Sequence, residues 1–256
     1  MTGELKGPET AAFRPGLFNG KTVLVSGATS GIGLAIAQGF AALGAQVIAT
    51  GSSTNKLEGL RADAALKGIR FEQLDVRDND AIKSFVATLS VLDVLVNAAG
   101  VARPVDEYRD DVFREVIDVN LTAAMRLAMA ARDKLEHARG SIVNVASMLS
   151  YIADVDVPAY CASKTGILGL TRSLAHAFGP AGVRVNAIAP GYHRTDMTRA
   201  LWEVPASAAK IASRSALKRW GEVDDLVGAT LFLASPASAF ITGVTLPVDG
   251  GYASGV

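Results

Sequence analysis

Cysteine, histidine and net charge are all scarce in this sequence of 256 residues, and each scarcity excludes a class of protein. The single cysteine, Cys161, cannot form a disulfide within the chain, which favours a reducing compartment such as the cytoplasm. The three histidines are scattered without the spacing of metal ligands, so no metal is expected. Lysine plus arginine equals aspartate plus glutamate at 25 each, which leaves no basic excess to bind nucleic acid. The composition favours a small-molecule partner.

Long apolar runs are missing as well. No run reaches the ~20 residues that a membrane-spanning helix needs, so no membrane association is expected. Residues 1–18 contain three glycines and two prolines but lack the apolar core of a signal peptide, and we interpret them as a flexible N-terminal arm. Residues 19–256 contain no linker and no repeat, which predicts one domain.

Seven short apolar runs alternate with stretches of helical periodicity, a rhythm typical of βαβ units. The predicted strands are 22–26, 46–50, 70–74, 93–96, 141–146, 183–189 and 244–248. The predicted helices include 33–43, 106–137 with a break near residue 118, 158–178 and 223–233. Because the strands are apolar on both faces, we expect an α/β fold: a single-domain, Rossmann-type, doubly wound parallel sheet of seven strands with helices on both faces. In such a sheet the ligand binds beyond the carboxyl ends of the strands.

The first predicted strand runs into a glycine-rich loop and then into a helix. The loop reads Ser26-Gly27-Ala28-Thr29-Ser30-Gly31-Ile32-Gly33. Glycine allows the backbone to approach a pyrophosphate closely, and the N–H groups at a helix N-terminus attract its negative charge. The alternative is a turn that needs glycine only for its geometry. The flanking strand and helix favour a dinucleotide site, and its predicted contacts are Gly27, Thr29, Ser30, Gly31, Ile32 and Gly33.

The GxxxGxG spacing of this loop, with motifs further along the chain, resembles the short-chain dehydrogenase/reductase family. The further motifs are Asp75 after the third strand, Asn97-Ala98-Ala99-Gly100 after the fourth, Asn120, Ser147, Tyr160 with Lys164, and Pro190-Gly191 followed by Thr195. Ala200-Leu201-Trp202 and the segment 245–251 are also similar to the carbonyl and polyol reductase branch that includes L-xylulose reductase. The resemblance implies an NAD(P)-dependent oxidoreductase that transfers a hydride between the cofactor and a secondary alcohol or ketone, and it implies a homotetramer.

Tyr160 and Lys164 lie one helical turn apart, so both side chains can reach the same ligand. Free tyrosine, with a pKa of about 10, is a weak base near neutral pH, but a nearby ammonium group stabilises the phenolate and should lower that pKa. Tyr160 would then act as general base in alcohol oxidation and as general acid in ketone reduction. The alternative is an ordinary tyrosine and lysine pair on a helix surface.

The resemblance adds roles for two further residues. It implies that Ser147 binds the substrate oxygen, that Lys164 also binds the nicotinamide ribose, and that Asn120 holds a water of a proton path. An asparagine that caps or kinks a helix is the alternative for Asn120. Cys161 should point away from this site, as a buried structural residue rather than a nucleophile.

Other cofactor contacts implied by the resemblance follow the later strands. They are Asp75 and Val76 at the adenine, Asn97, Ala98, Ala99 and Gly100 along the adenosine half, and Pro190, Gly191, His193 and Thr195 at the nicotinamide. A turn-forming or helix-capping aspartate is the alternative for Asp75. An exposed loop histidine is the alternative for His193.

The loop after the second strand bears on the choice between NAD and NADP. An acidic residue there would bind the ribose 2′-hydroxyl and repel a 2′-phosphate. The chain has Ser52 and Ser53 instead, with Ser30 at a second family position for the phosphate and Lys56 nearby. Small hydroxyl groups accept a phosphate without repulsion, which favours NADP(H) over NAD(H).

The stretch 195–215 is interpreted as a lid over the substrate, with core or subunit packing as the alternative. The predicted substrate contacts are Ser147, Tyr151, Tyr192, Leu201 and Trp202. Two other functions compete with the oxidoreductase: a non-enzymatic dinucleotide-binding redox sensor, and a sugar-nucleotide epimerase or dehydratase. The presence of all four candidate catalytic residues argues against the sensor, and the glycine spacing argues against the epimerase.

Overall fold

Seven parallel strands form the centre of the computed structural model, which describes residues 10 and 12–255. The strands are β1 (Thr22–Ser26), β2 (Gln46–Gly51), β3 (Ile69–Gln73), β4 (Val94–Asn97), β5 (Ser141–Val145), β6 (Arg184–Pro190) and β7 (Thr245–Val248). They lie side by side in the order β3-β2-β1-β4-β5-β6-β7, and every neighbouring pair is parallel. The chain therefore runs outward from β1 to β3 and then crosses back to place β4 on the other side of β1.

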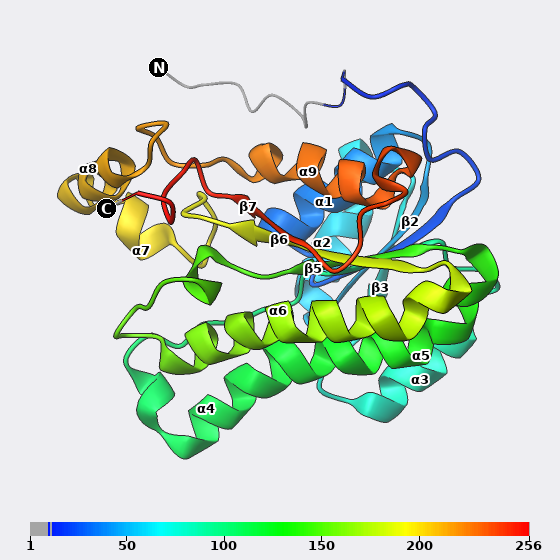
Figure 1. Cartoon of the computed structure of the whole chain (residues 1–256), viewed down its shortest axis with the longest axis horizontal. Coiled ribbons are helices and arrows are strands. Elements are labelled where there is room, and N and C mark those ends of the chain that lie inside the picture. Colours follow the sequence, from blue (N-terminus) through cyan, green and yellow to red (C-terminus); the bar gives the residue numbers. More distant parts are fainter. Residues whose placement is uncertain (1–9, 11, 256) are drawn as a thin grey trace.

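Helices cover both faces of this sheet, as Figure 1 shows. One face carries α1 (Gly31–Ala42), α2 (Thr54–Ala62) and α9 (Val227–Ala234), and the other carries α3 (Asn79–Ala87), α5 (Ala123–Ala138) and α6 (Pro158–Phe178). The remaining helices are α4 (Asp110–Ile117), α7 (Arg199–Trp202) and α8 (Pro205–Arg214). Figure 1 places α7 and α8 together at one end of the molecule, near the C-terminus.

Strand β1 shows why the strands are apolar throughout. Val23 and Val25 pack with α1 on one face of the sheet, whereas Leu24 packs with α5 and α6 on the other. All three side chains are fully buried. Because successive side chains of a strand point to opposite faces, a strand covered on both sides needs an unbroken apolar run.

The strands begin and end within one residue of their predicted bounds, and the predicted doubly wound sheet is confirmed. The predicted helix 106–137 is interrupted, as expected near residue 118. The chain forms a short turn at Asp106–Tyr108, then α4, then a π-helical turn at Asp118–Thr122, and then α5. A π turn holds more residues than an α turn, and such turns are frequent at functional sites. This one carries Asn120.

The predicted N-terminal arm needs a correction in its described part. Phe18 is buried, its ring packs edge-on against Phe40 at a centroid distance of 4.9 Å, and its N–H donates to the Leu43 carbonyl at 3.0 Å. The domain therefore begins before residue 19, because this apolar ring closes the core beside α1. Residues 1–9 and 11 lie outside the described part of the structure.

No helix in residues 10 and 12–255 combines the length and the apolar composition that crossing a membrane requires.

The core beneath α5 provides a test of this packing. Leu127 is fully buried between α5 and the sheet, so Leu127→Ala leaves a cavity and should lower the free energy of unfolding by about 2–5 kcal/mol. Met129→Ala, on the same helix but half-exposed, should change it by less than about 1 kcal/mol. Urea unfolding followed by circular dichroism measures both. Equal losses in the two variants would contradict the packing described here.

Candidate active site

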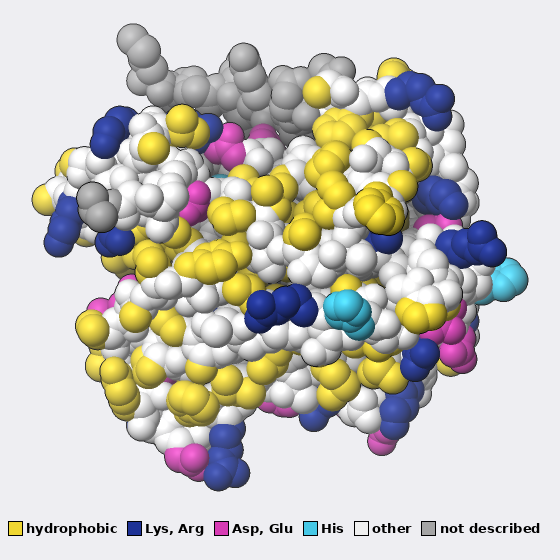
Figure 2. All heavy atoms as spheres, viewed as in Figure 1, with side chains coloured by type: hydrophobic (Ala, Val, Ile, Leu, Met, Phe, Trp, Pro, Cys, Tyr) yellow, Lys and Arg dark blue, Asp and Glu magenta, His cyan; other side chains and the backbone are white. Residues whose placement is uncertain are grey.

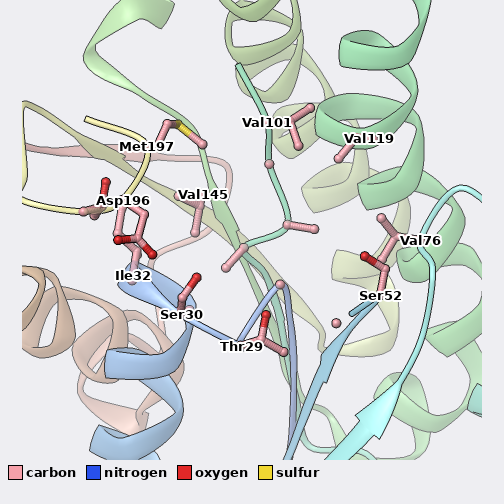
Figure 3. Close-up of a pocket in the computed structure, with 18 of the residues that line it drawn as sticks. Thr29, Ser30, Ile32, Ser52, Val76, Val101, Val119, Val145, Asp196 and Met197 are labelled. Carbon is pink, nitrogen blue, oxygen red and sulfur yellow. The ribbon is translucent and has the colours of Figure 1, made fainter. Parts of the chain in front are cut away.

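A cavity of about 400 Å³ opens at the carboxyl ends of β1, β2 and β4. Figure 3 shows the side chains around it: Thr29 and Ser30 from the loop after β1, Ile32 from the start of α1, Ser52 after β2, Val76 after β3, and Asp196 and Met197 after β6. The cavity lies where β1 and β4 are neighbours although two further strands separate them along the chain. This reversal of strand order is the ligand-binding position of doubly wound sheets.

The N-terminus of α1 faces this cavity without a capping side chain. Ser30, the residue before the helix, makes no side-chain hydrogen bond to it, and the first turn contains no acidic residue. The first N–H groups of α1 and its positive dipole end are therefore available to an anion. A pyrophosphate fits this position, because it offers the acceptor oxygens and the negative charge that the helix end lacks.

The backbone geometry at Gly27 is by itself a sufficient reason for a glycine at this position. Its φ is +68°, and a Cβ atom at this position would lie 2.4 Å from the Cα of Ala99 in the loop after β4. Gly100 is different, because a Cβ atom there would point toward the Asn120 Oδ1 atom at 3.5 Å and the Lys164 Nζ atom at 3.6 Å. A side chain at residue 100 would therefore extend toward Asn120 and toward Lys164, which lies in the wall of the cavity.

Most of the predicted cofactor contacts line the cavity. Those that do are Gly27, Thr29, Ser30, Gly31, Ile32, Gly33, Ser52, Asp75, Val76, Ala98, Ala99, Gly100, Tyr160, Lys164 and Thr195. Those that do not are Ser53, Asn97, Pro190, Gly191 and His193. Asp75 also agrees with the alternative of a turn-forming aspartate. Its carboxylate accepts hydrogen bonds from the guanidinium group and the backbone N–H of Arg77, and these bonds hold the pKa of Asp75 below its usual range.

The residues outside the cavity wall have structural partners. Ser53 caps α2 by accepting a hydrogen bond from the Lys56 N–H. The amide group of Asn97 donates to Asn144 Oδ1 at 2.8 Å, and Asn144 in turn donates to the Thr171 hydroxyl at 2.9 Å. This buried chain joins β4, β5 and α6. Asn97 therefore connects the sheet to the helix that carries Tyr160.

The alternative given for His193, an exposed loop histidine, is wrong. The ring is buried and packs against Gly221, where a Cβ atom would lie 2.4 Å from it. Its Nδ1 atom lies 3.1 Å from the Gly191 carbonyl oxygen, and burial lowers the pKa of the ring. His193 lines a separate cavity of about 180 Å³, together with Tyr192.

Tyr160 and Lys164 lie in the first turns of α6 and line the main cavity. The Lys164 Nζ atom lies 5.5 Å from the centre of the Tyr160 ring and donates a hydrogen bond to the Val145 carbonyl at 2.7 Å. Lys164 is buried, which anchors its ammonium group beside the end of β5. The two side chains meet on one helix face as their spacing predicted.

The expected lowering of the tyrosine pKa by lysine does not occur in this structure. Burial raises the pKa of Tyr160 to about 12, and a hydrogen bond with Ser147 offsets only part of that rise. Burial also lowers the pKa of Lys164 to about 8. Loss of hydration disfavours the charged form of each group and is the largest cause of both shifts. Tyr160 is therefore protonated at neutral pH, as a general acid has to be.

Ser147 and Asn120 complete the group that the sequence predicts. Ser147 begins a short turn after β5, where its hydroxyl accepts the Leu149 N–H at 3.1 Å and also bonds to Tyr160. Asn120 is buried, and its side chain binds both the N–H and the carbonyl of Val101, at 2.8 and 2.9 Å. Asn120 thus ties the loop after β4 to the π turn, which agrees with the alternative of a helix-kinking asparagine.

None of the predicted substrate residues is among those that line the main cavity, although Ser147 interacts with Tyr160 in its wall. Tyr192 packs between Trp220 and Tyr252 with ring centroids 5.4 and 5.2 Å away, so it belongs to an aromatic cluster. The Trp202 indole N–H donates to the Thr195 carbonyl at 3.1 Å and anchors α7 to the loop that lines the cavity. The side chains of Tyr151 and Leu201 are partly exposed.

Ten residues of the cavity wall had not been predicted: Gly51, Leu74, Arg77, Val101, Arg103, Glu115, Val119, Val145, Asp196 and Met197. Gly51 and Val145 end β2 and β5, and Leu74 directly follows β3, so the carboxyl ends of the strands were a usable signal for these three. Glu115 and Val119 come from α4 and the π turn, whose approach to the cavity depends on how the helix is placed.

Comparison with known proteins agrees with this geometry. Residues 27–253 match the family model described as enoyl-(acyl carrier protein) reductase. The chain is 38% identical to 2-dehydro-3-deoxy-D-gluconate 5-dehydrogenase of Bacillus subtilis, over 92% of this chain and 95% of that protein. It is 35% identical to 5-keto-D-gluconate 5-reductase of Escherichia coli K12, over 91% and 95% of the two chains.

A solved structure is similar over nearly the whole chain. The crystal structure of a gluconate 5-dehydrogenase from Burkholderia cenocepacia, in complex with NADP and tartrate, superposes with a TM-score of 0.85. The two are 33% identical, and the match covers 93% of this chain and 97% of that one.

The chain belongs to the short-chain dehydrogenase/reductase family. It is an NAD(P)-dependent oxidoreductase that transfers a hydride, as its sequence predicted, and its relatives lend no support to a redox sensor or a sugar-nucleotide epimerase.

The buried lysine should make unfolding depend on pH. Its pKa falls from 10.5 to about 8, so the charged form costs the folded state up to about 3 kcal/mol below pH 8, and this cost disappears as pH rises toward 10.5. Lys164→Met should therefore be more stable than the wild-type protein at pH 7, and its advantage should shrink between pH 8 and 10.5. Urea unfolding across that range measures the difference.

Tyr160 titrates in both the wild-type protein and Lys164→Met, so the difference between their free energies of unfolding isolates the contribution of Lys164. Lys67→Met, a change at the surface, is the matched control and should show no such trend. A constant difference between Lys164→Met and the wild-type protein from pH 7 to 10.5 would contradict the prediction.

Proposed function

We propose that this enzyme reversibly reduces a ketone group of a sugar acid with NADP(H), and that Tyr160, Lys164, Ser147 and Asn120 are its catalytic residues. The observation that carries the proposal is the place of Tyr160 and Lys164 in the wall of the cavity that begins at the open end of α1. A cofactor that lies along this cavity has its phosphates at α1 and its other end at Tyr160.

Tyr160 donates the proton in the reduction. Its raised pKa keeps the phenol protonated at neutral pH, so it can protonate the ketone oxygen as that oxygen gains negative charge. Ser147 bonds to the same phenol, which supports a role in donating a second hydrogen bond to the substrate oxygen. A bound nicotinamide supplies the hydride in this direction and accepts it in the other.

Lys164 and Asn120 support this step. The Lys164 ammonium group stabilises the phenolate that remains after the transfer, and it faces the space beside Gly100 where a cofactor ribose has to lie. Asn120 fixes the Val101 backbone and approaches the Ser163 hydroxyl, so it shapes the route by which Tyr160 regains its proton.

The cavity wall favours NADP(H). Ser52 follows β2 where an acidic residue would repel a 2′-phosphate, and Ser30 lies across the cavity in Figure 3. Arg77 adds a guanidinium group to the same wall, although it is paired with Asp75. A relative of known structure binds NADP, which supports the same choice.

The substrate class rests on the relatives. The Bacillus subtilis and Escherichia coli proteins are named for reactions at carbon 5 of gluconate derivatives, and the alignments cover 92% and 91% of this chain. The stretch 195–215 forms α7 and α8, and we assign it as the lid over the substrate because Trp202 anchors it to Thr195 at the cavity.

We further propose a cytoplasmic homotetramer. In Figure 2, hydrophobic side chains gather over α9 and the loop beside it and along the helices of the lower half, while charged groups lie mainly toward the edges. Phe240 is fully exposed, and Leu246 of the edge strand β7 is partly exposed. A second subunit would cover these side chains. A single free cysteine suits a reducing compartment.

The substrate and cofactor are tested together by a panel of ketones with NADPH and NADH. With 5-keto-D-gluconate the kcat/KM value should exceed that for an unsubstituted ketone such as cyclohexanone by at least about tenfold, because a polar site loses its hydrogen bonds with the apolar ketone. NADPH should be used more efficiently than NADH. A preference for the apolar ketone, or for NADH, would overturn the corresponding half of the proposal.

The role of Tyr160 is tested by removing its hydroxyl group. Tyr160→Phe should lower kcat by about 10²–10⁴-fold, the usual contribution of a general acid, and should leave NADPH affinity measured by fluorescence nearly unchanged. Tyr108→Phe removes a hydroxyl at the surface and serves as the control. Wild-type turnover in Tyr160→Phe would falsify the assignment.

A further inference from the structure

Glu107 is a buried carboxylate that the proposed reaction does not use. It lies in the short turn Asp106–Tyr108, and it is the only buried residue in the stretch 103–115. In the described part of the chain, Glu107 and Lys164 are the only buried side chains among Asp, Glu, Lys and Arg. Glu107 forms no ion pair with any described residue. Its burial is not explained by the apolar core, because its neighbours along the chain are exposed.

The Glu107 carboxylate binds two backbone N–H groups. One oxygen accepts the N–H of Arg103 at 2.8 Å, and the other accepts the N–H of Tyr160 at 2.8 Å. The second bond spans 53 residues of sequence. It joins the loop after β4 to the start of α6.

This bond caps α6. The helix begins at Pro158 after Val157, which has no side-chain acceptor to satisfy the first N–H groups of the helix. Glu107 supplies that acceptor from another element, and its negative charge lies at the positive end of a 21-residue helix. The N–H that it binds belongs to Tyr160 itself.

The Tyr160 backbone is held on its other side as well. The Ser163 hydroxyl donates to the Tyr160 carbonyl at 2.7 Å, and Asn120 donates to that hydroxyl at 3.1 Å. The peptide groups on both sides of the Tyr160 Cα atom are therefore fixed. A buried carboxylate is costly for stability, and a glutamine would have only one oxygen for the two donors.

We propose that Glu107 is a positioning residue for proton transfer: it caps α6 at Tyr160 and so fixes the tyrosine hydroxyl in the geometry that the reaction needs. The proposal rests on the proposed role of Tyr160. Glu107 also acts through its charge. Burial is the largest cause of the raised pKa of Tyr160, and the bond from Ser147 opposes it. Two nearby acidic groups, Cys161 and Glu107, raise that pKa further. The other ionisable group beside the phenol is Lys164.

Two substitutions separate reach from charge. Glu107→Gln keeps the length but removes the charge and one acceptor. It should lower kcat for 5-keto-D-gluconate with NADPH by about 10–100-fold, since small misplacements of a catalytic group cost that much, with KM and NADPH affinity changed by less than about threefold. The rising limb of kcat/KM for gluconate oxidation should move to lower pH. Glu107→Asp keeps the charge but shortens the side chain, so kcat should fall while that limb stays in place.

Asp106→Asn is the matched control, because it removes an exposed charge one residue away and should behave as the wild-type protein. Wild-type kcat and an unmoved pH profile in Glu107→Gln would overturn the proposal. A loss of activity that is fully accounted for by losses of NADPH affinity and thermal stability would also overturn it, because a merely structural role gives that result.

The failure of this proposal differs from the failure of the proposed function. If Tyr160→Phe retains turnover, the role of Tyr160 is wrong, and the role of Glu107 falls with it. If Tyr160→Phe is inactive while Glu107→Gln is fully active, only Glu107 is wrong. A crystal structure of Glu107→Gln adds a readout without substrate: a Tyr160 hydroxyl in its wild-type position would overturn the proposal, and a displaced one supports it.

Discussion

The parallel pairing of β1 with β4 is the constraint on which the rest of this structure depends. These strands are neighbours in the sheet although β2 and β3 lie between them in the chain, so the loops that follow them turn away in different directions. The space between the loops becomes the cavity. The loops also pass so closely that Gly27 has no room for a side chain next to Ala99. The open end of α1 and the end of α6 that carries Tyr160 line the same cavity.

The fold could be predicted because its signal is local and repeated. A strand buried on both faces needs an unbroken apolar run, as Val23, Leu24 and Val25 show, and seven such runs gave strand bounds within one residue. The glycine loop and the Tyr160/Lys164 spacing were equally visible, because each lies within one loop or one helical turn. Patterns of short range identify the elements and their order.

The parts that could not be predicted depend on contacts across long stretches of sequence. The sequence around Glu107 is acidic and typical of a surface segment, and only the fold brings this residue to the N-terminus of α6. His193 is buried because Gly221 leaves room for its ring. The direction of the Tyr160 pKa shift was also missed, because burial is its largest cause and only the three-dimensional structure shows how far Tyr160 is removed from water.

The π turn at Asp118–Thr122 has a consequence for the evolution of this chain. It holds one residue more than a regular α turn would. That extra residue rotates α4, which precedes the turn, by about 100° relative to α5. Substitutions in α4 can be absorbed one by one, but a deletion of one residue would restore a straight helix and turn the Asn120 amide group away from Val101. The helix would survive such a deletion and the site would not. Relatives that keep the chemistry should therefore vary in sequence here while keeping the length of this segment constant.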